Sequence, residues 1–119
     1  MGIHVSQTAL DDITVEGNTF PIDAVLGAFY QNGLGEFVCA GSVIWDDQSN
    51  VIPVWGSANG IQDGQEFILF AFVNGETFYA ISPVLDSDAV YFSGTDISLY
   101  EADFSYFSNS DNILYYQSL

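Results

Sequence analysis

Aspartate and glutamate are the residues of this sequence with the clearest chemical potential, because they make up 16 of its 119 residues. Two groups lie close enough along the chain to act together: Asp46 with Asp47, and Asp63 with Glu66. Paired carboxylates perform glycoside hydrolysis, in which one acts as acid and the other as base or nucleophile. A chain this acidic contains such pairs by chance, and small β-domains rarely enclose a cleft. We therefore expect no enzyme and no catalytic residue.

The same four carboxylates, Asp46, Asp47, Asp63 and Glu66, are the candidate ligands for a metal ion. Hard cations such as Ca²⁺ take several oxygen ligands from carboxylates, amides and carbonyl groups. The loop at 59–66 and the turn at 46–50 both supply these groups, but neither follows EF-hand spacing. We expect these carboxylates to lie in solvated turns and to accept hydrogen bonds from backbone N–H groups. The alternative is that one of the two loops binds Ca²⁺. No other cofactor is expected.

Two other reactive side chains occur once each. His4 has no Ser or Cys companion in a recognisable triad, and one histidine is too few for a histidine-based zinc site. Cys39 lies in the apolar run 37–40 and, as the only cysteine, forms no disulfide within the chain. We expect His4 to be exposed or hydrogen-bonded, and Cys39 to be a small buried apolar residue.

The charge balance excludes several classes of partner. The chain has no Lys and no Arg, and its formal net charge is −16. Nucleic acids and anionic membranes are both bound through Lys and Arg, so neither is an expected partner. The repulsion favours solubility and opposes casual association. A marine or extracellular setting, rich in cations that screen charge, suits such a chain.

Aromatic residues in the last third of the chain are the candidate ligand or interface residues. Adjacent residues of a strand point to opposite faces, so Tyr106–Phe107 and Tyr115–Tyr116 cannot both face one core. Ordinary packing, an assembly interface and sugar stacking are the alternatives for these rings. The candidates are Tyr100, Phe104, Tyr106, Phe107, Tyr115 and Tyr116.

Strand signals recur every 8–12 residues or so, which predicts one all-β domain over residues 1–119 with little or no helix. The expected fold is an antiparallel β-sandwich, Ig-like or jelly-roll, of about eight to ten strands. Asn74-Gly75 predicts a tight type I′ hairpin. The predicted strands are His4–Ala9, Thr14–Phe20, Val25–Tyr30, Glu36–Trp45, Val51–Trp55, Glu66–Val73, Thr77–Ser82, Ala89–Phe92, Ile97–Phe107 and Asn112–Gln117.

Two of these strands, Val25–Tyr30 and Glu66–Val73, are apolar at nearly every position, which indicates cover on both faces or cover on one and a partner on the other. Gly27 and Gly41 indicate a bulge or a close backbone approach. No apolar run approaches the ~18 residues of a membrane helix. The N-terminal residues MGIHVSQTALDD lack the basic and apolar regions of a signal peptide.

The stretch 24–73 resembles a β-rich module repeated in large exported surface proteins of marine and other Bacteroidetes, and similar stretches occur in structural proteins of marine phages. The chain departs from that pattern at 57–59, where Ser-Ala-Asn replaces the frequent Asp and Thr, which puts an ion site there in doubt. The resemblance rests on Gly27, Phe29, Tyr30, Cys39, Ala40, Gly41, Trp45, Trp55, Gly56, Asp63, Gly64, Glu66 and Phe67.

This resemblance implies a structural module without catalytic function. We expect a protein partner, through self-assembly or in a larger surface or virion structure such as a filament or a capsid or tail decoration. The alternative is a carbohydrate-binding or adhesin domain that uses exposed aromatic residues, with or without Ca²⁺. We expect Trp45 and Trp55 to be core residues rather than ligand platforms.

Overall fold

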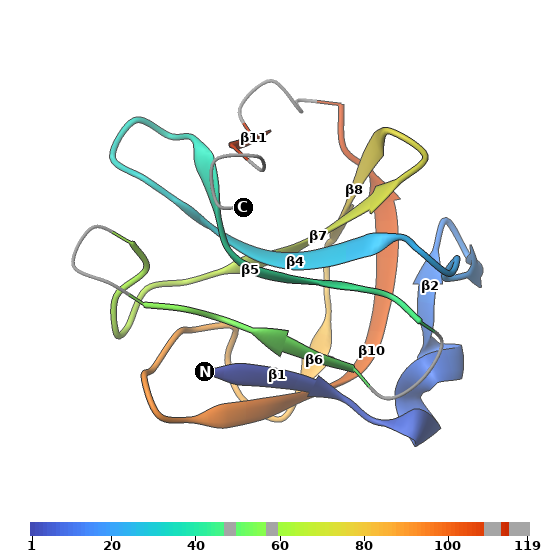
Figure 1. Cartoon of the computed structure of the whole chain (residues 1–119), viewed down its shortest axis with the longest axis horizontal. Coiled ribbons are helices and arrows are strands. Elements are labelled where there is room, and N and C mark those ends of the chain that lie inside the picture. The colour runs from blue at the N-terminus through green and yellow to red at the C-terminus, as the bar shows by residue number, and fades with distance from the viewer. Residues whose placement is uncertain (47–49, 57–59, 109–112, 115–119) are drawn as a thin grey trace.

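The computed structural model describes residues 1–46, 50–56, 60–108 and 113–114 (Figure 1). Almost all regular structure is β, and a 3₁₀ helix, η1 (Gln7–Asp12), follows the first strand. No helix in these residues is long and apolar enough to cross a membrane. The strands are β1 (Gly2–Val5), β2 (Ile13–Val15), β3 (Asn18–Thr19), β4 (Val25–Gln31), β5 (Phe37–Ile44), β6 (Asn50–Pro53), β7 (Ile68–Val73), β8 (Glu76–Ala80), β9 (Val84–Leu85), β10 (Asp96–Tyr106) and β11 (Ile113–Leu114).

The strands form one mixed sheet in the order β11-β5-β4-β7-β8-β10-β1-β6, with β2 and β9 also paired to β10 and with β3 paired to β2. The all-β prediction is confirmed, but the purely antiparallel prediction is wrong and the sandwich is not confirmed. Strand β1 pairs with β10 in parallel, as do β2 with β10 and β11 with β5. Hairpin signals specify only neighbouring strands, whereas these parallel pairs join segments far apart in the chain.

Strand β10 is shared by the two halves of the sheet. Its first half pairs with β1 and β9, and its second half pairs with β8 and β2. The register with β9 shifts between Leu99 and Glu101, as at a bulge. Figure 1 shows β10 running from the β1 end of the molecule to the β8 end. The sheet therefore curls around its core.

The far end of the curled sheet returns to β5. The Trp55 N–H donates to the Ala40 carbonyl oxygen at 2.9 Å. A Cβ added to Gly41 would overlap the carbonyl oxygen of Pro53, so glycine is what lets the two backbones approach. The expected close approach at Gly41 is confirmed, and β4 and β5 also shift register between Ala28 and Phe29.

Two apolar clusters lie on opposite faces of the central strands. The main core takes alternate residues such as Leu26 and Ala28 of β4 and Leu69 and Ala71 of β7. The second aromatic cluster lies on the other face of these strands, so β4 and β7 are covered on both faces, which is the first of the two predicted alternatives. This cluster consists of Phe29, Cys39 and Phe70, with Phe37, Phe72, Tyr79, Phe107 and Ile113 packed against them.

The local predictions that depended on turn chemistry hold best. Asn74 and Gly75 both have positive φ, 50° and 82°, and they connect β7 to β8 as a type I′ turn does. The predicted strand His4–Ala9 is wrong after Val5, because β1 ends there and η1 begins at Gln7. The predicted strand Ala89–Phe92 is reduced to one bridge between Val90 and Glu66. Of Asn112–Gln117, only β11 lies within the described residues.

Candidate functional site

Asp63 is engaged by hydrogen-bond donors. Its carboxylate accepts the Ser93 backbone N–H at 2.8 Å and the Ser93 hydroxyl at 3.3 Å. A backbone bond from the Gly64 N–H to the Tyr91 carbonyl oxygen, 2.8 Å long, runs alongside. Asp63 thus joins the loop before β7 to the turn before β10, as expected of a carboxylate that accepts backbone N–H groups.

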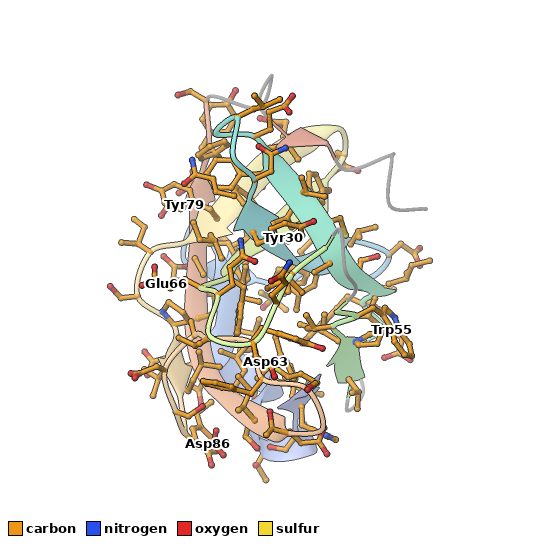
Figure 2. The ribbon with its side chains drawn as sticks, turned by 90° about the vertical axis from the view of Figure 1, so that its left-hand side faces the viewer. Tyr30, Trp55, Asp63, Glu66, Tyr79 and Asp86 are labelled. Carbon is orange, nitrogen blue, oxygen red and sulfur yellow. The ribbon has the colours of Figure 1, made fainter. Side chains whose placement is uncertain are left out.

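The three candidate metal ligands that lie within the described residues, Asp46, Asp63 and Glu66, do not form one metal-holding group. Asp46 lies exposed just after β5, and Asp47 lies outside the described residues. Figure 2 shows Glu66 at the left side of the molecule and Asp63 lower and nearer the centre of the view. Within the described part of the chain, no group of three or more His, Cys, Asp or Glu residues is placed to hold a metal ion. Calcium binding stays a prediction.

Glu66 lies where two neighbouring strands separate. The pairing of β4 with β7 ends at Phe29 and Ile68, and β4 continues to Gln31 paired only with β5. The segment before Ile68 turns away to the other side, where Phe67 N–H donates to the Ala89 carbonyl oxygen at 3.0 Å. A space of about 300 Å³ opens between them, which we name the fork hollow. Its lining residues are Phe29, Tyr30, Gln31, Phe37, Gln65, Glu66 and Ile68.

One side-chain hydrogen bond crosses the fork hollow. The Gln65 amide nitrogen donates to the Gln31 carbonyl oxygen at 3.2 Å, while the Gln65 amide oxygen accepts the Gln62 N–H at 3.2 Å. Tyr30 is 8% exposed, and burial raises the pKa of its hydroxyl above the ordinary value of 10.0. The hydroxyl therefore stays protonated at neutral pH. A second space of about 320 Å³ lies between Glu66 and the residues 88–90.

The aromatic candidates of the last third have different environments. Tyr100 and Tyr106 are about half exposed, as an interface role requires. Phe104 is fully buried, so its inclusion as a surface residue was wrong: it lies on the inward face of β10 and contacts Phe20. Tyr115 and Tyr116 lie outside the described residues.

Phe107 is part of the second aromatic cluster rather than an exposed ring. Its ring centroid lies 5.1 Å from Phe70, 5.3 Å from Tyr79 and 5.9 Å from Phe37, all in edge-to-face geometry. Such pairs add to the stabilisation from burial alone. The adjacent rings of Tyr106 and Phe107 thus do divide between two faces, as their position in a strand predicts.

The two tryptophans also differ. Trp45 is 1% exposed and packs on Phe20 with ring centroids 5.0 Å apart, so its core role is confirmed. Trp55 is 73% exposed, so the same prediction was wrong for it. Every residue from Val51 to Trp55 is apolar, so the sequence did not show which alternate set faces inward. Figure 2 shows Trp55 on the opposite side of the molecule from Glu66.

Trp55 extends an outward-facing line of apolar side chains. Ile52 and Val54 are buried, whereas Val51 and Trp55 are exposed and Pro53 is half-buried. We name Val51, Pro53 and Trp55 the β6 outer strip. Beside it, Val51 pairs in register with His4, whose ring nitrogen Nε2 lies 3.6 Å from the Asp96 carboxylate. His4 is exposed, as expected.

Comparison of the chain with protein-family models, with curated proteins and with solved structures finds no match. The resemblance to exported surface modules and phage structural proteins therefore stays a prediction that rests on the sequence motifs alone.

Proposed function

We propose that this chain is a non-enzymatic structural module of an extracellular or virion assembly, and that it contacts neighbouring copies through the β6 outer strip. The observation that carries the proposal is the exposure of Trp55, in line with the exposed Val51. Tryptophan is enriched among the residues that dominate binding energy at protein interfaces. Exposed apolar side chains that lie in one line are typical of a contact site.

The net charge determines when such contact forms. Each copy has a formal charge of −16, so two copies repel each other at low ionic strength. The screening length falls from about 10 Å at 0.1 M salt to about 3 Å at 1 M. Association through an apolar strip is therefore expected only where salt is abundant, as it is in a marine or extracellular environment.

The test is the oligomeric state at two salt concentrations. Sedimentation velocity in about 0.05 M and about 1 M NaCl should show monomers at low salt and larger particles at high salt. Trp55→Ala should remain monomeric at both. Leu34→Ala is the matched control, because Leu34 is 84% exposed in the β4–β5 turn and lies outside the strip. A wild-type chain that stays monomeric at high salt and high concentration would refute the proposal.

A second candidate function is supported by the same tryptophan. An exposed indole ring has an apolar face on which a sugar ring can stack, so a carbohydrate-binding or adhesin role fits Trp55 as well. A glycan array in millimolar Ca²⁺ distinguishes the two functions. Glycan binding that Trp55→Ala abolishes, together with a monomer at high salt, would favour the carbohydrate role. An array on which no glycan binds would rule out the carbohydrate-binding role.

A further inference from the structure

The fork hollow lies apart from the β6 outer strip, because its Glu66 and the Trp55 of the strip are on opposite sides of the molecule (Figure 2). Hydrogen bonds hold part of its lining in place, because the Gln65 amide is hydrogen-bonded through both of its polar atoms. The Gln31 amide nitrogen donates to the Gly35 carbonyl oxygen at 3.2 Å, which holds the other wall. Preformed walls reduce the entropy that a ligand and its site lose on binding.

The charge around the hollow selects the charge of the ligand. The Glu66 side chain is exposed at the hollow, and no hydrogen bond or ion pair to its carboxylate occurs among the described residues. The whole chain contributes 16 acidic residues and no Lys or Arg to the surrounding field. An anionic ligand would find no counter-charge here, whereas a cation is attracted both by Glu66 and by the field as a whole.

The lining selects the shape of the cation. Ile68 and Phe37 offer apolar surface beside the carboxylate, and Tyr30 adds a ring and a protonated hydroxyl. A bare metal ion would use only the oxygen atoms and leave this apolar surface unfilled. An alkyl chain that ends in an ammonium group uses both kinds of surface, because its stem is apolar and its head carries three N–H donors.

We propose that the fork hollow binds a primary alkylammonium group, with the ammonium at the Glu66 carboxylate and the alkyl stem against Phe37 and Ile68. The group can belong to a free amine or to a lysine side chain of another protein. The volume of about 300 Å³ is at the lower end of ligand sites and suits one such chain. A lysine of this kind has to come from a different protein, because this chain has none.

The test is a titration of the full chain with n-butylammonium chloride, followed by ¹H–¹⁵N NMR at constant ionic strength. Saturable shifts are expected at the backbone amides of Gln31, Gln65 and Glu66. Glu66→Gln should weaken binding about fivefold, near the upper end for one exposed ion pair. Glu76→Gln removes one charge at the β7–β8 turn and should leave the affinity unchanged. A blocked lysine amide is titrated in parallel, and its affinity is compared with that of n-butylammonium. Tighter binding of the lysine amide would indicate a protein source, and weaker binding would indicate a free amine.

Three results would overturn the proposal. Shifts that spread over many carboxylates without saturating would indicate general attraction to an acidic surface. An equal loss of affinity in Glu66→Gln and Glu76→Gln would also indicate general attraction to the acidic surface rather than binding at the hollow. Equal binding of neutral n-butanol or methyl glucoside at the hollow would show that the site does not select a cation. None of these results depends on whether the β6 outer strip mediates assembly.

Discussion

The central strands β4 and β7 and the edge strand β6 are all made of nearly continuous apolar residues, yet their surroundings differ. Both faces of β4 and β7 are buried, one by the main core and the other by the second aromatic cluster. Only one face of β6 is buried, through Ile52 and Val54, while Val51 and Trp55 remain in solvent. The same kind of sequence thus builds a core on both faces in one region and leaves apolar side chains exposed in the other.

The largest expected effect tests the stability half of this comparison. Phe70 is fully buried in the second aromatic cluster and has edge-to-face contacts with Phe29, Phe37 and Phe107. Phe70→Ala should lower the free energy of unfolding by about 3–5 kcal/mol, because it leaves a cavity among rigid rings. Trp55→Ala should change it by no more than about 0.5 kcal/mol. Urea denaturation of both variants measures the two changes in the free energy of unfolding. Similar changes would show that the two regions do not differ in their contribution to stability.

An intermediate effect is expected where the two regions meet. Gly41 of β5 lies directly against the backbone of Pro53, next to the hydrogen bond between Trp55 and Ala40. Gly41→Ala should force the two backbones apart and cost about 1–3 kcal/mol in urea denaturation, as overpacking does. Gly33→Ala is the control, because a Cβ there meets nothing within 4 Å. Equal stability of the two variants would mean that β6 is not held against β5.

The smallest effect concerns pH and the outer face of β10. The Thr14 hydroxyl, 2.7 Å away, and the Gly17 N–H, 3.0 Å away, donate to Asp103 and lower the pKa of its carboxyl group. A carboxyl whose pKa is lower when folded stabilises the fold above its unfolded pKa of about 4, and this contribution is lost as pH falls through the folded pKa. Asp103→Asn should therefore be less stable than wild type at pH 6, with a smaller difference near pH 3.

The control for this pH effect is Asp11→Asn, which removes the same charge from an exposed position of helix η1. Urea denaturation of the three proteins at both pH values separates the hydrogen bonds of Asp103 from the general repulsion among 16 carboxylates. A stability difference between Asp103→Asn and Asp11→Asn that does not change with pH would show that the hydrogen bonds do not matter for stability.

The candidate site could be predicted only in part. The exposure of Tyr100 and Tyr106, the burial of Cys39 and the use of Asp63 as an acceptor for backbone N–H all follow from local pattern. The exposure of Trp55 does not follow from local pattern, because residues 51–54 are all apolar. Alternation along the strand then leaves open whether 51, 53 and 55 or 52 and 54 face the core. The fork hollow is also invisible in the sequence, since Gln31 and Gln65 meet only in the folded chain.

The sequence by itself determined the β class, the Asn74–Gly75 hairpin and the high net negative charge. These depend on residue type, on turn chemistry and on net charge, which act locally or add up over the chain. Only the tertiary structure decided the parallel insertion of β1 beside β10, the return of β6 to β5 and the side on which Trp55 lies. Those features arise from contacts between segments far apart in the chain, and hydrophobic burial alone does not specify which partners meet.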